Sequence, residues 1–234
     1  MKRSHALLCC GLAAALTGCA GGKVNYVKPD FNGPDFVAML PPNNLSNDLM
    51  APRAALGAMS SAMIGLGYFP ITSPVHEEIL RKLGMTDGGQ VNAFKLADLA
   101  KALGTDGIAV TTINDFNKIN LGFYISPTVD CSVVLHDDKG ERLWEAQAKF
   151  TEKKINIDPQ AALQAAVGEM VGDAIGKMFK THLIMESQKM AGIIVQTCSM
   201  NKPSLAYPGP LYMSMNAPAA AGAKSPGALG GLKQ

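Results

Sequence analysis

The feature that most constrains this chain is a change of hydrophobic period to two between residues 107 and 150. Four segments alternate apolar and polar residues, as half-buried strands do: 107–113 (GIAVTTI), 118–125 (KINLGFYI), 128–136 (TVDCSVVLH) and 142–150 (RLWEAQAKF). Asp137 to Gly140 joins the last two segments, with glycine where a hairpin turns. Trp144 and Glu145 then face opposite sides. The pattern predicts an antiparallel sheet with one buried and one wet face.

Helical and strand-like segments precede this sheet. Strand-like runs occupy 36–42 and 68–71, and helical patterns occupy 51–67, a segment that opens at Ser73, and 92–104. We therefore predict one α/β domain, residues 36–202, with a mixed, largely antiparallel sheet of about five strands and helices packed mainly on one side.

Segments of a different composition flank the predicted domain. Residues 19–35 are rich in Gly, Pro and Asn and lack helical or strand periodicity, which predicts a flexible tether. Residues 203–234 are rich in Pro, Gly and Ala and cannot bury much apolar surface. We expect a disordered C-terminal tail there.

The N-terminus predicts export. Lys2 and Arg3 precede an apolar run at 6–16 that is too short to span a bilayer, and small residues follow it. Residues 1–18 are therefore expected to be a signal peptide that the mature chain lacks.

The end of this signal resembles the lipobox of bacterial lipoproteins. Leu16, Thr17 and Gly18 precede Cys19, and the resemblance implies diacylglycerol on the Cys19 thiol, cleavage before Cys19 and an N-acyl chain on its new amino group. Ala20 stands where an Asp is the usual inner-membrane retention signal, so the resemblance favours the periplasmic face of the outer membrane. The alternative is an ordinary secreted protein with an incidental cysteine.

Charge and cysteine content agree with an exported globular domain. The formal net charge of +2 falls to about zero once Lys2 and Arg3 leave with the signal, which gives no electrostatic case for nucleic-acid binding. Of five cysteines, only Cys131 and Cys198 remain free of the signal and the anchor. We favour two buried free thiols over a disulfide, since Cys131 alternates with apolar residues.

A glycine stripe marks the late part of the chain. Gly168, Gly172 and Gly176 recur every fourth residue of a long helical pattern at 159–183. This stripe resembles a transmembrane dimerisation face, but charged residues at the same spacing argue against a membrane span. Glycines in register permit close approach of another backbone. We expect either a helix packed on its own sheet or a face for a partner or self-association. A second, short helix is expected at 187–197.

Residues that carry chemistry are scattered. The segment that begins at His76 (HEEIL) lacks the second histidine of a zinc-binding H-E-x-x-H pattern, and His136 precedes an exposed turn. Ser60 and Ser61 lie in helical sequence without a nucleophile elbow. Met213 and Met215 make an incomplete site for Cu(I). We predict no catalytic residue, no metal and no cofactor apart from the lipid on Cys19.

Several blocks together resemble a bacterial outer-membrane lipoprotein family of unknown function. They are FVAMLPP, GYFPI, GIAVTTINDF, VVLHDDKGERLWEAQA, MAGII and LAYPGP, in consistent order over residues 16–212. The resemblance implies a fold like the N-terminal domain of TolB, related to the periplasmic part of the curli secretion lipoprotein CsgG. The chain departs from the family pattern by continuing from about residue 213 to Gln234.

The resemblance implies a function without catalysis. Members of that family commonly accompany a CsgG-like lipoprotein and another small lipoprotein. The expected function is therefore a lipid-anchored periplasmic interaction subunit, accessory to an envelope transport or secretion complex. The alternative is a structural lipoprotein linking the outer membrane to peptidoglycan, and a periplasmic enzyme comes third.

Overall fold

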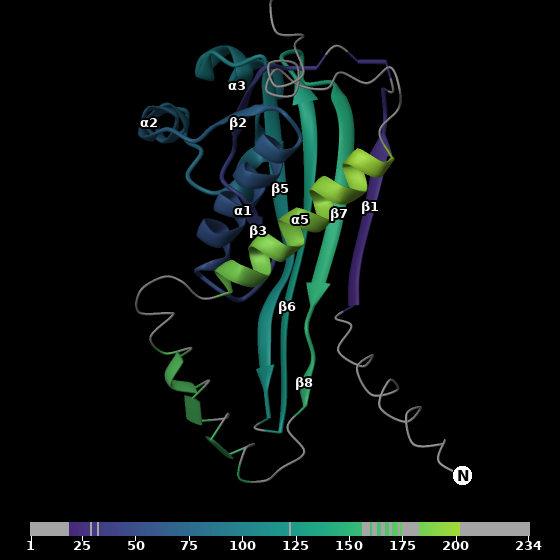
Figure 1. Ribbon diagram of the computed structural model, residues 1–234. Coiled ribbons are helices and arrows are strands. Elements are labelled where there is room, and N and C mark those ends of the chain that lie inside the picture. The colour runs from purple at the N-terminus through teal and green to yellow at the C-terminus, as the bar shows by residue number, and fades with distance from the viewer. Residues whose placement is uncertain are drawn as a thin grey trace, which may run out of the picture.

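The computed structural model describes residues 19–28, 30–31, 33–121, 123–155, 160, 163–164, 167–168, 170–172, 174 and 183–201. An eight-stranded sheet has the order β1-β7-β6-β5-β2-β4, with β3 paired to β5 and β8 to β6 (Figure 1). The strands are β1 (Cys19–Tyr26), β2 (Phe36–Met39), β3 (Asn43–Asn44), β4 (Phe69–Ile71), β5 (Gly107–Asn120), β6 (Tyr124–Asp137), β7 (Arg142–Thr151) and β8 (Lys154–Ile155). The helices are α1 (Ala51–Gly65), α2 (Pro74–Lys82), η1 (Gly88–Ala93), α3 (Leu96–Leu103) and α5 (Ile184–Met200).

The sheet is mixed and largely antiparallel. β2 runs parallel to β4 and β5, and β3 runs parallel to β5, whereas β1, β5, β6, β7 and β8 pair in antiparallel fashion. The predicted α/β class is therefore confirmed. The expected number of strands was too low, because β1 was not anticipated and β3 and β8 are two-residue strands.

The two long hairpins follow from the alternating sequence. β5 pairs with β6 over nearly its whole length, and β6 continues into β7 through a turn in which the Asp137 carboxylate accepts hydrogen bonds from the backbone of Lys139 (3.0 Å) and Glu141 (2.8 Å). Gly140 takes the left-handed conformation there, with φ 78°. The separate strand predicted at 118–125 is wrong. The chain turns between Asn120 and Tyr124, and the apolar residues of that turn conceal it in the sequence.

Helices α1 and α5 form a layer over one face of the sheet, and α5 crosses it diagonally (Figure 1). The inward residues of β6 and β7 meet this layer, and Trp144 is 1% exposed at its centre. The Trp144 indole Nε1 donates a hydrogen bond to the Tyr68 hydroxyl at 3.3 Å. The main core therefore lies between these two helices and the sheet, and buried side chains of this core are Met59, Met63, Val133, Leu135, Met190 and Ile194.

A second, smaller core lies on the other face. Ile108 of β5 and Ala38 of β2 point away from α1 and pack with residues of α2, η1 and α3, such as Leu80, Val91 and Leu99. Helices thus cover both faces at the β2–β5 end, not mainly one side as expected. Over β6 and β7 this second face is polar, and Gln147 donates to Asp130 at 2.9 Å.

The first described residues correct the predicted tether at 19–35. Residues 19–26 form β1, which pairs with β7 from Cys19↔Thr151 to Tyr26↔Trp144. Val24 and Tyr26 pack against the core, whereas Lys23 and Asn25 are exposed. This is a period of two that the neighbouring glycines and asparagine obscured. Residues 19–26 therefore belong to the sheet and do not form a flexible tether.

Gly22 lets α5 approach β1. A Cβ at this position would lie 2.2 Å from Thr197 Oγ1 and 3.0 Å from Ile193 Cγ2, whereas a Cβ at Gly21 would meet nothing within 4 Å. Gly22→Val is therefore expected to lower the free energy of unfolding by about 1–3 kcal/mol through overpacking. Gly21→Val is the matched control, because valine suits a strand at both positions. Urea unfolding of both variants tests this, and equal stabilities would contradict the close contact.

Candidate functional site

The predicted lipidation site lies at the start of the sheet. Leu16, Thr17 and Gly18 are outside the described residues, as is the whole predicted signal peptide, and Cys19 is the first residue of β1. Its backbone is level with Thr151 of β7. A lipid on Cys19 would therefore be joined directly to the folded sheet, without an intervening linker. Within the part of the chain that the structure describes, no helix is long and apolar enough to cross a bilayer.

Two glycines of the stripe, Gly168 and Gly172, show no close contact with the described residues of the sheet. A Cβ at Gly168 or Gly172 would meet no atom within 4 Å, and Gly176 lies outside the described residues. The two described glycines therefore give no support to a helix packed on its own sheet. α5 fills that place instead, because its residues Met190, Ala191 and Ile194 supply the buried face.

Apolar residues near these glycines are also uncovered. Leu163 is 69% exposed and Met170 is 66% exposed, and Val167 and Val171 are exposed as well. Their spacing puts them on one side of a helix. The partner or self-association alternative therefore remains open for this segment.

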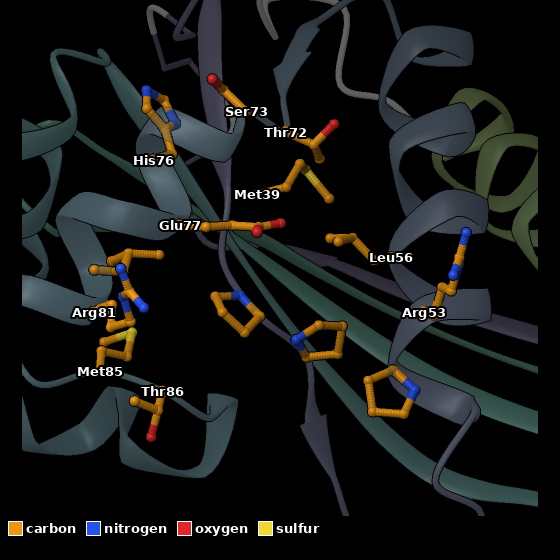
Figure 2. Close-up of a pocket in the computed structure, with 14 residues that line it drawn as sticks. Met39, Arg53, Leu56, Thr72, Ser73, His76, Glu77, Arg81, Met85 and Thr86 are labelled. Carbon is orange, nitrogen blue, oxygen red and sulfur yellow. The ribbon is translucent and has the colours of Figure 1, made fainter.

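A groove of about 570 Å³ lies among the described residues (Figure 2). It lies between α2 and the first half of α1, at the end of β2. This is near the β4 edge of the sheet, and β1 forms the other edge. The lining is rich in proline and other apolar side chains: Met39, Pro41, Pro42, Pro52, Leu56, Leu80 and Met85. Gly88 packs closely against the backbone of this lining, since a Cβ there would lie 2.3 Å from the Pro41 carbonyl oxygen.

Positively and negatively charged side chains both line the groove. Figure 2 shows Arg53 on the α1 side and Glu77 reaching from the α2 side toward the middle. Arg81 also lines the groove, but its guanidinium pairs with Glu78 on the helix surface. Arg53 is exposed and no ion pair with another described residue is found for it. The groove therefore presents an available cation and an acidic residue across an apolar floor.

The polar groups of the groove do not form a catalytic arrangement. Ser73 caps α2, its Oγ accepting a hydrogen bond from the Val75 backbone at 3.2 Å. The buried Nδ1 atom of His76 has no hydrogen-bond partner among the described residues, so it does not activate a neighbouring hydroxyl.

The other residues considered for chemistry are held in structural roles. Ser60 and Ser61 donate to carbonyl groups one turn back within α1, at 2.8 and 3.0 Å. Among the described residues no three His, Cys, Asp or Glu side chains gather as metal ligands. Met213 and Met215 lie outside the described residues.

The two thiols are buried and free, as predicted. Cys131 and Cys198 are 0% and 1% exposed and belong to the main core. Burial raises the pKa of each thiol to about 12, and the nearby Asp130 adds to the effect on Cys131. Burial also raises the pKa of Tyr26, whose hydroxyl donates to the Cys198 carbonyl at 3.0 Å. These groups stay protonated at neutral pH, so none is an activated nucleophile.

His136 couples the stability of the sheet to pH. Burial lowers its pKa below the usual 6.5, the Arg142 guanidinium lowers it further, and its Nδ1 atom is buried without a hydrogen-bond partner in the described structure. The unfolded chain therefore binds a proton more readily than the folded chain, and stability is lost as pH falls below about 6.5. His136→Gln should reduce the loss of unfolding free energy between about pH 7 and pH 5. Urea midpoints across this range measure it, and parallel pH profiles would contradict it.

The groove was not predicted from the sequence. Arg53 and Glu77 come from segments more than twenty residues apart, and neither belongs to a recognised motif. The available signal was the clustering of Pro41, Pro42 and Pro52 around the start of α1. Prolines there predict a rigid, uncovered surface, but not which helix faces it.

Comparison with known proteins places the chain among lipoproteins. A family model described as "Putative lipoprotein GNA1162-like" matches residues 25–210. "Putative lipoprotein NMB1124/NMB1162" of Neisseria meningitidis serogroup B (strain ATCC BAA-335 / MC58) is 25% identical over 177 residues, which cover 70% of this chain and 80% of the relative.

Solved structures include three similar chains. The crystal structure of lipoprotein GNA1162 from Neisseria meningitidis has a TM-score of 0.47 at 22% identity and covers 62% of this chain and 98% of that chain. The PelC dodecamer from Paraburkholderia phytofirmans has a TM-score of 0.44 at 12% identity, covering 78% and 97%. The LpoB C-terminal domain from Salmonella enterica has a TM-score of 0.35 at 15% identity, covering 51% and 84%.

Proposed function

The chain belongs to the GNA1162-like lipoprotein family, and from this premise we propose that it is a lipid-anchored periplasmic interaction subunit. Cys19 carries the lipid and holds the domain on the periplasmic face of the outer membrane. The domain acts without catalysis, as an accessory to an envelope transport or secretion assembly. Its partners are other envelope lipoproteins, including a CsgG-like one.

The groove between α1 and α2 carries this proposal. Its apolar floor offers contact area, and Arg53 and Glu77 offer charges that a partner's side chains can match. Such a surface suits a segment of another protein.

The groove also lies away from the anchor. It is at the β4 side of the sheet, and β1 with Cys19 forms the opposite edge. A protein partner can therefore reach the groove while the lipid remains in the membrane.

Copurification with a charge reversal in the groove tests the proposal. Arg53→Glu is expected to reduce the recovery of other envelope lipoproteins from crosslinked, detergent-extracted membranes, as measured by mass spectrometry. Lys149→Glu is the matched control, because Lys149 is exposed on the polar face of β7. Equal recovery with both variants would contradict a role for the groove.

The alternative is a structural lipoprotein that links the outer membrane to peptidoglycan. Retention of the purified protein on peptidoglycan, without recovery of any lipoprotein partner, would favour that alternative and overturn the proposed one. An enzyme would need a nucleophile and a base in contact. In the described part of the groove, Ser73 caps a helix and His76 Nδ1 stands unpaired.

A further inference from the structure

The β5–β6 hairpin extends past the residue that carries the lipid. The strand registers place Cys19 level with Thr151, Thr151 level with Thr128, and Thr128 level with Asn117. β5 continues beyond Asn117 to Asn120 before the chain turns. The four residue steps from Asn117 to Leu121 span about 13 Å at the rise of a strand. Figure 1 shows β5, β6 and β8 projecting beyond the Cys19 end of β1.

The end of this hairpin exposes large apolar side chains. Ile119 is 49% exposed, Leu121 is 60% exposed and Phe123 is 59% exposed. Ile155 of β8 is 63% exposed and lies beside them, because β8 pairs with β6 at Tyr124↔Ile155. We name these four residues the apolar tip. Water-soluble surfaces seldom gather such residues without a contact to cover them.

The turn itself is held rigidly. The Leu121 backbone N–H donates to the Tyr124 carbonyl at 2.8 Å, and the Phe123 N–H donates to the Leu121 carbonyl at 3.0 Å. These two backbone N–H groups are therefore paired within the hairpin, so they can enter an apolar medium without losing their hydrogen bonds.

Lysines surround the base of the apolar tip. Lys153 and Lys154 are exposed beside it, and Lys118 lies one residue before Ile119. Glu152, the nearby acidic residue, is paired with Lys189 at 3.2 Å and with Lys154 at 3.9 Å. Apolar residues with lysines behind them match a bilayer surface, where acyl chains lie below anionic headgroups.

We propose that the apolar tip inserts into the lipid leaflet beside the acyl chains of Cys19. This inference rests on the lipidation of Cys19 in the proposed function. The lipid holds one point of the sheet at the headgroups, and the tip reaches about 13 Å further along the strand direction. Two attachments fix the tilt of the domain relative to the bilayer.

Quenching by brominated lipids tests the insertion. The acylated mature protein, which begins at Cys19 and carries Phe123→Trp, is reconstituted into vesicles. The vesicles contain phosphatidylglycerol and phosphatidylcholine with brominated acyl chains. The native Trp144 is buried in the core and gives a constant background. Val75→Trp is the matched control, because Val75 is 64% exposed and lies on α2, outside the apolar tip.

The expected result is strong quenching of the tryptophan at 123 and little quenching at 75. Adding Leu121→Asp to an Ile155→Trp protein should also reduce the quenching at 155, while acylation and membrane fractionation stay unchanged. Equal quenching at 123 and 75 in protein whose mass confirms the acyl chains would overturn the insertion. Partner recovery in the copurification experiment is measured separately. If quenching shows no insertion of the apolar tip, the proposed interaction with a partner is unaffected. If no partner is recovered, the proposed insertion is unaffected.

Discussion

Cys19→Ser is expected to leave an uncleaved and unacylated precursor. A serine oxygen does not replace the thiol that receives diacylglycerol in the lipoprotein pathway, so cleavage before residue 19 should also fail. The fold should be preserved, because the backbone of residue 19 still pairs with Thr151. The expected change is complete: no acyl label on the protein, and a gel mobility that corresponds to the chain with residues 1–18 attached.

Cys9→Ser and Cys10→Ser are the matched controls for this experiment. Both cysteines lie in the apolar run of the signal, outside the lipobox at 16–19. They should be processed and acylated like the unaltered protein. Normal acyl labelling of Cys19→Ser would contradict the lipid anchor, and with it the membrane position of the domain.

Trp144→Ala is expected to lower the free energy of unfolding by about 3–5 kcal/mol, as for other large-to-small changes in a core. Trp144 is among the largest fully buried side chains and lies between β7 and the α1–α5 layer. The substitution leaves a cavity and removes the donor that the Tyr68 hydroxyl accepts from. Urea unfolding followed by circular dichroism measures the loss, because Trp144 is the one tryptophan of the chain.

Lys149→Ala is the control on the same strand. Lys149 faces the opposite, exposed side of β7, so the change should stay within about 0.5 kcal/mol. If both variants lost the same stability, the assignment of a buried and a wet face to this strand would be wrong.

The long hairpins were predictable because their alternating sequence is compatible with few structures other than paired, half-buried strands. Alternation from residue 107 to 150 and the glycine at 140 define which face is buried and where one turn lies. The turn between Asn120 and Tyr124 was missed, because its exposed Leu121 and Phe123 imitate a buried strand. Alternation shows that residues are apolar, but not whether protein or another medium covers them.

A helix was expected at 187–197, and α5 spans Ile184–Met200, but its packing against β1 was not predicted, and neither was β1 itself. Gly22 weakens the strand pattern locally, yet it is the residue that admits Thr197 of α5 against the sheet. The glycines at 168 and 172 suggested the same kind of contact, but a Cβ there would meet open space. A glycine permits close approach wherever it lies, and only tertiary structure decides which glycine is used.

The candidate site was only partly predictable. The lipobox is a local motif, so Cys19 could be identified from four neighbouring residues, and its lipidation stays a prediction. The groove depends on how far α2 stands from α1, which no short motif records. Its chemistry comes from Arg53 and Glu77, and residues of these types are usually solvated charges.

Site-specific photocrosslinking in cells tests most directly whether this lipoprotein binds a protein partner through the groove. A photoreactive residue is placed by Thr86→benzoylphenylalanine at the groove and, as a control, by Gln147→benzoylphenylalanine on the polar face of β7. We expect crosslinks from position 86 to another envelope lipoprotein, and none from position 147. Peptidoglycan fragments alone, or the same products from both positions, would contradict it.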